Sequence, residues 1–535
     1  MVMRAMRSFL LRLAAAALSG GLLAISFTDG PTVLAWIGLA PVLYAVASSP
    51  RIWGALVCAL TFCAVWILPA LYFTAKQSTA GWLALSVYTS LYYILALIAF
   101  RYLPRLGLAS AVFGTAALWA CMEIARSRMP VIGFPWLLMG HLWVDYPTLR
   151  QGADLLGVYG LSFTMVLFNA ALAFALPNLK LRLAFLPPPG LRTLAACLAA
   201  PLLLLGALFL YGHLRIGQLS PKLERGPTIA VLQGMTLSKQ DRSSAEKAAQ
   251  LEQHLALHAQ ALENAPANDK PVLVCWAETM VPGVYNRDDY SSQFEAITRT
   301  TGVPALGGIE WIDTQDVDLT IEDQRWYNGV QVLDAHGEPL ARYAKRRLVP
   351  FGEYIPWTNT LPFLKSLRSV TNDTYTRGET RSPVVEVGGV KLAFNICIED
   401  AYPELAREAA KAGADLYVNL TNDGWFVGTS GPAMHLKCAA LRAVEVRRPL
   451  LRVNNAQYSV LVDPLGQVDT LVQPDEVGVG YAHVERLSEP VETLAMRMGE
   501  VGAVTLFLLV FVGAVLFDRN TVRNPLPMNK LQANK

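Results

Sequence analysis

The segment VKLAFNICIED, residues 390–400, is the most informative stretch for the fold of this chain. Its first eight residues, 390–397, form a mostly apolar run that is typical of a strand and ends at Cys397. Two carboxylates, Glu399 and Asp400, come after the cysteine. Negative neighbours raise the pKa of a thiol, whereas the thiolate is its reactive form. The segment therefore predicts either an inert buried cysteine or a nucleophile that needs a cation from elsewhere in the chain.

Apolar runs and amphipathic helices alternate on both sides of this segment, over roughly residues 220–490. The run PVLVCWAE, residues 271–278, is continuously apolar up to its last residue, and residues 326–345 show a hairpin pattern around the turn DAHGE. Further strands are expected at 227–234, 303–311 and 414–420, and helices at 243–262, 291–302, 403–413 and 433–448. Helices that cover both faces of layered sheets predict an α/β sandwich.

The composition of the whole chain predicts a membrane protein. Hydrophobic residues make up 53% of its 535 residues and charged residues only 16%, against about 25% charged residues in an average soluble protein. A helix needs about 20 apolar residues to cross the hydrocarbon core of a bilayer. We predict eight such spans, near residues 9–27, 31–49, 52–74, 80–100, 106–122, 158–177, 193–211 and 501–517.

These spans predict three regions. Residues 1–215 form a membrane domain with seven helices, residues 220–490 form a globular domain, and residues 491–535 form a C-terminal transmembrane helix and a short cytoplasmic tail. Cytoplasmic loops are enriched in Lys and Arg. An inside N-terminus places most Lys and Arg residues of the segments that flank the spans inside, namely Arg4, Arg7, Arg12, Arg51, Arg101, Arg105, Lys180, Arg182, Arg192, Arg519, Arg523 and Lys530. In a bacterium, the globular domain then lies on the periplasmic side of the inner membrane.

Several classes of function find no support in the sequence. The net charge is only +3 and no basic block is present, which argues against nucleic-acid binding. The sequence contains neither a phosphate-binding loop nor a credible dinucleotide fingerprint, and GTSGP is not a serine-nucleophile motif. The seven cysteines and seven histidines show no spacing typical of metal sites or disulfide frameworks. We therefore expect no metal and no cofactor.

Three ionisable residues follow predicted strands, where open α/β folds place their ligands: Glu278, Lys345 and Cys397. Each has a simple structural explanation when taken alone, as a surface carboxylate, a solvated lysine and a small core residue respectively. Together they form a coherent set for acyl transfer. A thiol nucleophile needs a base for its proton, and the negative oxygen of a tetrahedral intermediate needs a fixed cation or donor.

Four segments carry a family resemblance: WAET with Glu278, YAKRRLVPFGEY with Lys345, NICIED with Cys397, and NLTNDGWF. They resemble the nitrilase-type carbon–nitrogen hydrolase superfamily. The combination of LVPFGEY, TNDGWF and RAVEVRRPLLR with flanking membrane spans is narrower, and it is similar to the apolipoprotein N-acyltransferase family. The resemblance covers nearly the whole chain and implies a nitrilase-like αββα sandwich between the seventh and eighth spans.

The resemblance also implies roles for individual residues. Cys397 is the nucleophile that forms a thioester with a fatty acyl chain from a membrane phospholipid, Glu278 is the general base, and Lys345 stabilises the oxyanion. Glu353 and Glu399 match further positions of the family's active site; Glu353 is expected to orient Lys345 and Glu399 to line the site. The acceptor is the α-amine of a diacylglyceryl-cysteine at the N-terminus of a bacterial apolipoprotein, which implies ping-pong kinetics.

Two positions depart from the family pattern. Ala277 stands where a proline commonly precedes the base, and Ile398 stands where an aromatic residue is frequent after the nucleophile. These departures are expected to alter the shape of the loops or the fit of the acyl chain rather than the chemistry.

Two apolar segments are candidates for lipid binding. Trp425 and Phe426 follow TND on a predicted loop, and they are candidates to line a lipid site or simply to pack. The broken apolar segment GFPWLLMG, residues 133–140, either lines a lipid access path or packs between helices. The sequence leaves open whether His435, on a predicted helix, lies near the pocket. Two alternatives are a membrane-anchored hydrolase that uses water as acceptor, and a transporter or scaffold with an inert globular domain.

Overall fold

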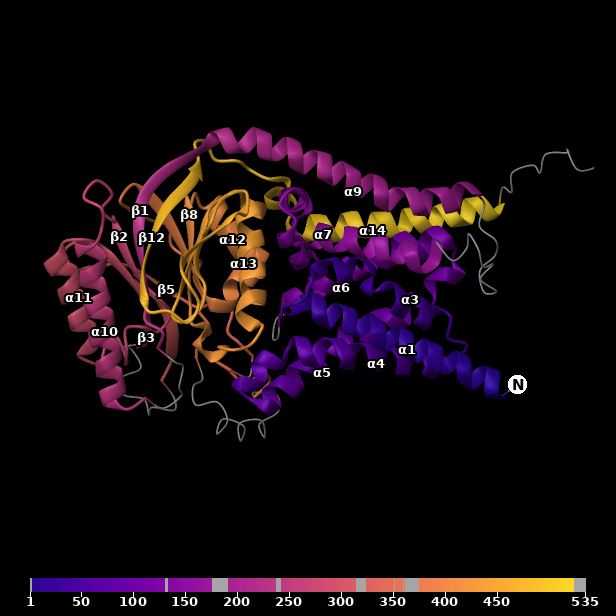
Figure 1. Ribbon diagram of the computed structural model, residues 1–535, viewed down its shortest axis with the longest axis horizontal. Helices are drawn as coiled ribbons and strands as arrows, with labels where there is room; N and C mark the ends of the chain where they lie inside the picture. The colour runs from indigo at the N-terminus through magenta and orange to yellow at the C-terminus, as the bar shows by residue number, and fades with distance from the viewer. Residues whose placement is uncertain are drawn as a thin grey trace, which may run out of the picture.

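The computed structural model describes residues 2–129, 133–175, 191–236, 242–313, 324–350, 352–358, 360 and 375–523. Residues 176–177 of the predicted sixth span, and Lys180, Arg182 and Lys530 of the orientation argument, lie outside the described residues. The described chain forms a bundle of long helices and a globular α/β part, and the two lie end to end (Figure 1).

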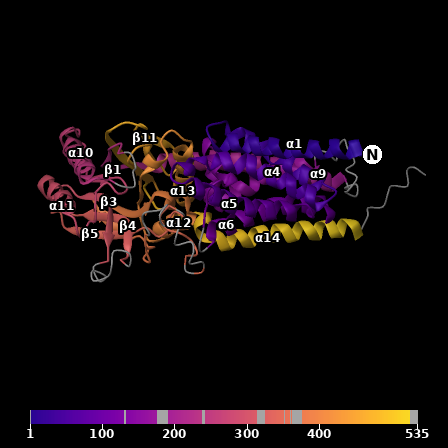
Figure 2. The ribbon, with the colours of Figure 1, turned by 90° about the horizontal axis from the view of Figure 1, so that it is seen from below.

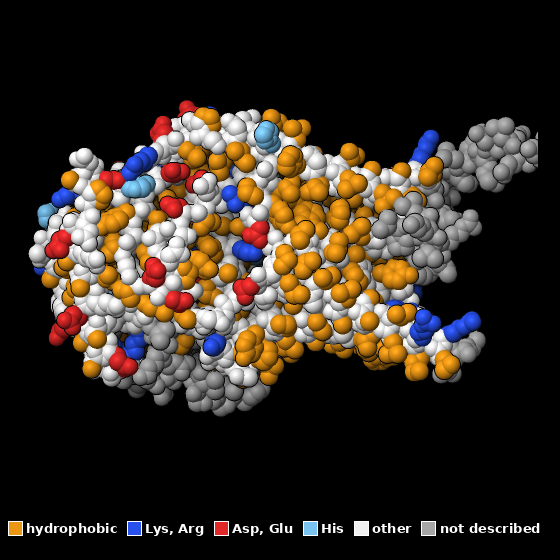
Figure 3. Space-filling view, in the orientation of Figure 1, with side chains coloured by type: hydrophobic (Ala, Val, Ile, Leu, Met, Phe, Trp, Pro, Cys, Tyr) orange, Lys and Arg blue, Asp and Glu red, His pale blue; other side chains and the backbone are white. Residues whose placement is uncertain are grey.

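The bundle contains long apolar helices. Within the described ranges, six helical segments are long and apolar enough to cross a membrane. They contain α1 (Val2–Phe27), α4 (Ile52–Ala70), α5 (Thr79–Phe100), α7 (Ala153–Ala170), α9 (Leu191–Leu219) and α14 (Leu494–Arg523). Hydrophobic side chains cover the visible face of the bundle, whereas charged side chains are spread over the α/β part (Figure 3). The chain is thus a multi-pass membrane protein.

Two predicted spans take a different form. The segment predicted at 31–49 is broken into η1 (Thr32–Leu34), α2 (Ala35–Gly38) and α3 (Ala40–Ala47). The segment predicted at 106–122 becomes the π-helical turn η4 (Ser110–Gly114) and α6 (Thr115–Arg128). The number of helices that cross the bilayer therefore stays a prediction. Short helical turns complete the bundle: η2 (Tyr72–Lys76), η3 (Leu103–Arg105), η5 (Met139–Asp145), η6 (Leu149–Gly152), η7 (Ala171–Ala175) and η8 (Ser220–Lys222).

Two six-stranded sheets form the centre of the α/β part, and an apolar core fills the space between them. The first sheet has the order β12-β1-β2-β3-β4-β5 and the second β11-β10-β9-β8-β7-β6. The first comprises β12 (Gly478–Leu487), β1 (Leu223–Gln233), β2 (Leu273–Trp276), β3 (Ala305–Ile312), β4 (Trp326–Leu333) and β5 (Pro339–Ala344). The second comprises β11 (Val468–Val472), β10 (Ser459–Val462), β9 (Leu450–Asn454), β8 (Leu416–Thr421), β7 (Val390–Ile396) and β6 (Val385–Val387).

Helices cover the outer face of each sheet. α10 (Ser244–Glu263) and α11 (Tyr290–Thr301) lie on the first sheet, far from the bundle, whereas α12 (Pro403–Lys411) and α13 (Gly431–Val446) lie between the second sheet and the bundle (Figures 1 and 2). The predicted α/β sandwich is confirmed, with the layer order αββα. The predicted strand at 390–397 corresponds to β7 and the predicted helix at 403–413 to α12.

The two parts are joined both covalently and by packing. α9 leads into β1, and β12 leads into α14; β1 and β12 pair antiparallel, with Leu223 opposite Leu487. Both chain connections therefore leave the same edge of the first sheet. Buried side chains of α12 and α13 belong to the same apolar core as those of the bundle. This packing holds the second sheet, and whatever lies at its strand ends, against the membrane helices.

Candidate active site

The three residues that the sequence singled out lie together at strand ends. Glu278 comes two residues after β2, Lys345 directly after β5, and Cys397 directly after β7. The Nζ atom of Lys345 lies 3.1 Å from Oε1 of Glu278. Both charges act on the thiol of Cys397. The two facing sheets thus bring a carboxylate, an ammonium and a thiol from distant segments into one site.

The backbone at this site is held in an uncommon conformation. Cys397 has a φ of 51° and Thr279, directly after Glu278, a φ of 56°. Such a left-handed non-glycine residue costs about 1–3 kcal/mol and persists where the surrounding structure enforces it, often at functional sites. The Cys397 carbonyl oxygen accepts a hydrogen bond from Nδ2 of Asn419 at 3.0 Å. Cys397 is the first residue of the turn η11 (Cys397–Ala401).

A close approach of strand β3 fixes the segment that carries Glu278. A Cβ atom on Gly308 would lie 2.5 Å from the Ala277 carbonyl oxygen, from Cα of Glu278 and from the Thr279 nitrogen. The Gly308 N–H donates to the Ala277 carbonyl at 3.2 Å. Only glycine allows β3 to pass this close, so the sequence GGIE within β3 is part of the site.

Lys345 is held by two carboxylates. Its Nζ lies 2.7 Å from Oε1 of Glu353 as well as 3.1 Å from Glu278, and the side chain is only 1% exposed. Burial lowers the pKa of Lys345, but Glu278 and Glu353 more than offset it and raise that pKa well above its ordinary value. Lys345 is therefore a permanent buried cation, as oxyanion stabilisation requires.

The Cys397 thiol rests in its protonated form. Burial, followed by the charge of Glu278, raises its pKa well above the ordinary value, and Lys345 acts in the opposite direction. A thiol of this kind needs a base that removes its proton during attack. Glu278 is the carboxylate with the strongest effect on it, and is thus the available base.

Asn328 is a site residue that the sequence analysis missed. Its Nδ2 donates to Oε1 of Glu278 at 2.8 Å and to Oε1 of Glu353 at 3.2 Å. Glu353 is fixed further by the Val349 N–H, which donates to Oε2 at 2.8 Å. A signal was available, because Asn328 shares a face of β4 with apolar Val330 at the two-residue period of a strand.

Glu399 holds the backbone around the nucleophile turn. It is not among the residues that line the cavity described next. It is fully buried. Its carboxylate accepts hydrogen bonds from the backbone N–H groups of Arg346, Arg347 and Ile396 at 2.6, 2.9 and 2.8 Å, and from the Tyr343 hydroxyl. Burial raises the pKa of Glu399, and these donors and Lys345 counteract the rise. Glu399 therefore lies at the nucleophile turn, and its expected role as a supporting active-site residue stays a prediction.

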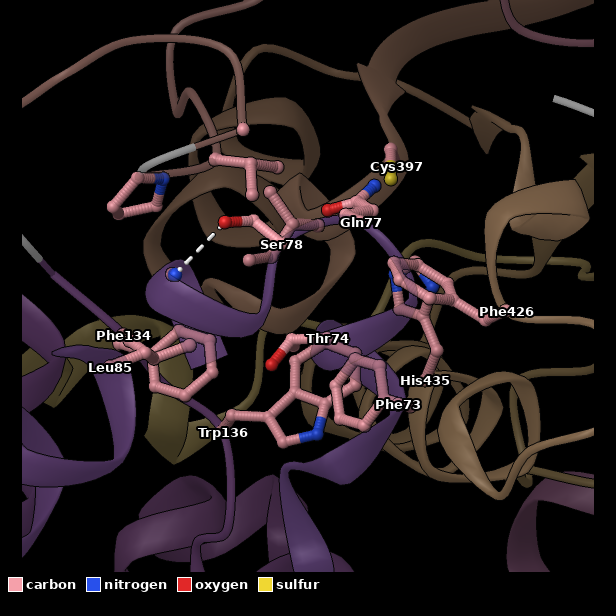
Figure 4. A pocket seen from close by; sticks show the side chains of 15 residues that line it. Phe73, Thr74, Gln77, Ser78, Leu85, Phe134, Trp136, Cys397, Phe426 and His435 are labelled. Carbon is pink, nitrogen blue, oxygen red and sulfur yellow. Dashed lines mark hydrogen bonds between the residues drawn. The ribbon is translucent and has the colours of Figure 1, made fainter. Parts of the chain in front are cut away.

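A cavity connects Cys397 to the helix bundle. Its empty volume, counted with the space that is open to solvent, is about 630 Å³. The bundle contributes Phe73, Thr74, Gln77, Ser78, Gly81, Leu85, Phe134 and Trp136, and the α/β part contributes Val349, Pro350, Gly352, Cys397, Ile398, Phe426 and His435. In Figure 4, Cys397 lies at one end of the cavity beside Gln77, with Phe134 and Trp136 at the other end. The wall is thus mainly apolar around a single nucleophile.

The two aromatic candidates behave differently. Phe426 lines the cavity and packs edge-to-face on Phe73 of the bundle, with ring centroids 5.1 Å apart. Trp425 is not among the lining residues. The apolar segment GFPWLLMG contributes Phe134 and Trp136 to the cavity wall. Part of the segment therefore reaches the cavity, as the alternative of a lipid access path requires. Among the described residues, no cluster of His, Cys, Asp or Glu side chains suits a metal ion.

Two family models match this chain, and one solved structure shows a distant similarity. Residues 228–489 match the carbon–nitrogen hydrolase family, and residues 19–171 match the apolipoprotein N-acyltransferase N-terminal domain. A solved amidase from Nesterenkonia sp. aligns with 50% of this chain and 92% of its own, at 22% identity and a TM-score of 0.37.

Two curated relatives are similar over most of their length. An apolipoprotein N-acyltransferase of Azotobacter vinelandii is 32% identical over 444 residues, which cover 82% of this chain and 80% of the relative. One of Geobacter metallireducens is 28% identical over 522 residues, covering 95% and 96%. The chain, a membrane enzyme of the carbon–nitrogen hydrolase superfamily, therefore belongs to the apolipoprotein N-acyltransferase family.

Proposed function

We propose that this protein transfers a fatty acyl chain from a membrane phospholipid, through a thioester on Cys397, to the N-terminal α-amine of a diacylglyceryl-cysteine in bacterial apolipoproteins. The observation that supports this most is the cavity, since its nucleophile comes from the α/β part and most of its aromatic wall from the bundle. An acyl chain can then reach Cys397 without leaving apolar surroundings.

The first half-reaction charges the enzyme. Glu278 takes the proton of the Cys397 thiol while the sulfur attacks an ester carbonyl of the phospholipid. Lys345, 3.1 Å from Glu278, stabilises the oxygen that becomes negative. The tetrahedral intermediate then breaks its bond to the glycerol oxygen, which receives the proton from Glu278. A lysophospholipid leaves, and the acyl chain stays on Cys397 as a thioester.

The second half-reaction transfers the chain. The α-amine of the acceptor attacks the thioester carbonyl, Lys345 again stabilises the oxyanion, and Glu278 accepts a proton from the amine. The carbon–sulfur bond breaks, the thiolate takes the proton back, and an amide forms. Glu353 and Asn328 hold Lys345 and Glu278 in place through both steps.

The proposed location follows from the substrates. We place the cavity at the periplasmic surface of the inner membrane, with residues 220–490 as the catalytic domain and residues 1–215 in the membrane. Residues 491–535 then comprise the C-terminal transmembrane helix and a short cytoplasmic tail. Extracting an acyl chain into water costs about 0.8 kcal/mol per CH₂. A site against the bilayer avoids this cost, whereas a hydrolase of small soluble substrates gains nothing from an aromatic wall built by membrane helices.

The proposal is tested by trapping the acyl-enzyme. Purified full-length protein is incubated with phospholipid labelled in its acyl chain and then denatured. Wild type is expected to hold a label that hydroxylamine releases, and Cys397→Ala to hold none. Equal labelling of Cys397→Ala would disprove the role of Cys397. The matched control is Cys275→Ala, at a buried cysteine of the core strand β2, which is expected to be labelled like wild type.

Acceptor use is tested separately. Addition of a diacylated lipopeptide is expected to discharge the label and to yield a triacylated peptide. Release of free fatty acid at the same rate with and without lipopeptide would instead favour a hydrolase.

A further inference from the structure

A buried group of charged residues that the proposed reaction does not use lies behind Cys397. It consists of Asp400 in η11, Asp423 in η12 (Asp423–Trp425), His435 in α13 and Arg452 in β9, and is called the charged cluster here. His435 is 2% exposed and the other three are 0% exposed. Ionised groups buried this deeply are retained only when they are paired.

Each ring nitrogen of His435 faces a carboxylate oxygen in the charged cluster. Nε2 of His435 lies 3.0 Å from Oδ1 of Asp400, and its Nδ1 lies 3.1 Å from Oδ1 of Asp423. Arg452 bridges the remaining oxygens: its Nη1 binds Oδ2 of Asp400, and its Nη2 lies 2.7 Å from Oδ2 of Asp423 and 2.7 Å from Nδ1 of His435. With His435 protonated, two cations stand against two carboxylates, and the charged cluster is neutral.

The surroundings favour the protonated form. Burial and the nearby Arg452 guanidinium lower the pKa of His435, but Asp400 and Asp423 outweigh both and raise it to about 9. Among the described residues, these three have the largest charge effects on the imidazole, from β9, η11 and η12. On its remaining side the ring lies 5.1 Å from the ring of Trp136, a neutral residue of the bundle.

The charged cluster is close enough to affect the nucleophile. His435 lines the same cavity as Cys397 (Figure 4). Asp400 belongs to the turn that Cys397 begins. Moreover, the charge of Asp423 raises the pKa of the Cys397 thiol. Loss of the histidine charge would leave the cluster with a net charge of −1 beside a thiol that must become negative in order to react.

We propose that His435 is a positioning residue that keeps Cys397 reactive, because its positive charge neutralises Asp400 and Asp423 and fixes the turn that carries the nucleophile. The inference rests on the proposed role of Cys397. It adds a second cation to the Glu–Lys–Cys set. Lys345 precedes the thiol in the sequence, whereas His435 follows it and lies on a helix that contacts the bundle. His435 touches no reacting atom in this scheme.

The test measures how the reactivity of the Cys397 thiol depends on pH, without any lipid. Full-length protein in detergent is alkylated with iodoacetamide from about pH 6 to about pH 8, where His435 keeps its charge, and the peptide that contains Cys397 is quantified by mass spectrometry. His435→Gln leaves the cluster at −1 and is expected to move the rate–pH profile upward by about one pH unit, which is about a tenfold lower rate at a fixed pH. Asp423→Asn leaves it at +1 and is expected to move the profile downward in pH.

The double variant His435→Gln with Asp423→Asn is neutral again and is expected to titrate like wild type. The control is His483→Gln, which removes another histidine–aspartate pair of the same domain, 3.3 Å to Asp269, and is expected to change nothing. An unshifted rate–pH profile in His435→Gln, or the same shift direction in His435→Gln and Asp423→Asn, would overturn the proposal.

If His435→Gln does not fold, the other two variants still decide the matter. Asp423→Asn should move the rate–pH profile downward from wild type, and the double variant should move it upward from the profile of Asp423→Asn. Because alkylation needs no lipid, this test is independent of acyl transfer. A wild-type protein that titrates as expected but accepts no acyl chain would refute the proposed function and leave the charge effect standing.

Discussion

At the scale of single residues, charges from distant segments decide the reactivity of Cys397. Its sequence neighbours Glu399 and Asp400 are both occupied, the first by backbone N–H groups and the second by Arg452. The strongest charges on the thiol come from Glu278, which raises its pKa, and from Lys345, which lowers it. The cation that the sequence required is therefore present, but it counterbalances a different carboxylate from the two expected.

Removal of the buried cation tests this balance. Lys345→Met is expected to lower the rate of acyl-enzyme formation by about 10²–10³-fold, the usual effect of losing an oxyanion-stabilising group. The variant also leaves Glu278 and Glu353 without a cation between them. The measurement is single-turnover labelling of Cys397. Lys391→Met, at an exposed lysine of β7, serves as the control and should label at the wild-type rate.

The charge of His435 also predicts a pH dependence of stability. Its pKa is about 9 in the folded protein, against an ordinary value of 6.5. A raised pKa means that folding favours the protonated form, so the stabilisation is complete below about pH 6.5 and is lost as the pH rises through about 9. Its full size is on the order of 3 kcal/mol. Denaturant unfolding should show that wild type loses stability over this interval more steeply than His435→Gln; parallel curves would contradict the assignment.

At the scale of elements, short segments between regular elements build the cavity. The Phe134 and Trp136 carbonyls accept hydrogen bonds from the guanidinium of Arg126 in α6, and the Met139 N–H donates to Oε1 of Glu123 at 3.0 Å. The Tyr402 hydroxyl, next to the nucleophile turn, binds the Gly133 carbonyl. The aromatic wall is therefore fixed by polar side chains of the bundle helix α6 and tied to the turn that carries Cys397.

The strand approach at Gly308 gives a steric prediction. Gly308→Ala places a methyl group 2.5 Å from three backbone atoms around Glu278, so β3 and the base must move apart. Because a misplacement of about 1 Å can cost on the order of 10²-fold in rate, acyl transfer should fall strongly while the protein still folds. Gly217→Ala, at a glycine of α9 with no atom within 4 Å of an added Cβ, should keep wild-type rates.

At the scale of the whole molecule, buried ion pairs join the α/β part to the bundle. Nη2 of Arg447, at the end of α13, lies 2.8 Å from Oδ2 of Asp154 in α7, and both side chains are at most 1% exposed. The Val158 N–H of α7 donates to Oε1 of Glu445 in α13 at 2.7 Å. Such contacts specify one docking of the two parts, which the cavity requires because its walls come from both.

Two ion pairs across this junction differ in burial and allow a matched comparison. Asp154→Ala leaves Arg447 buried without its carboxylate partner and also removes the contacts of Asp154 with Arg215 and Tyr211 of α9, which is expected to cost about 3–5 kcal/mol. Asp145→Ala breaks the exposed contact with Lys437, 2.9 Å long, and should cost no more than about 1 kcal/mol. Thermal unfolding in detergent measures both. Equal losses of stability would mean that the Arg447–Asp154 pair does not hold the two parts together.

The sequence by itself determined the local features of this protein. The spacing and length of apolar patterns predicted strands such as β7 and helices such as α12, because the apolar residues of a regular element show which of its faces is buried. Long apolar runs predicted the membrane helices, and short motifs singled out Glu278, Lys345 and Cys397. Broken segments were harder, as at Thr32–Ala47, where turns divide an apolar run.

Only the tertiary structure decided which distant groups meet. Asn328 bridges Glu278 and Glu353, His435 joins Asp400 to Asp423, and the cavity wall combines Phe134 with Phe426. Electrostatic and packing energies depend on separations in space, and the packing of two sheets and a helix bundle sets those separations. A sequence pattern with a period of two or four residues carries no information about them.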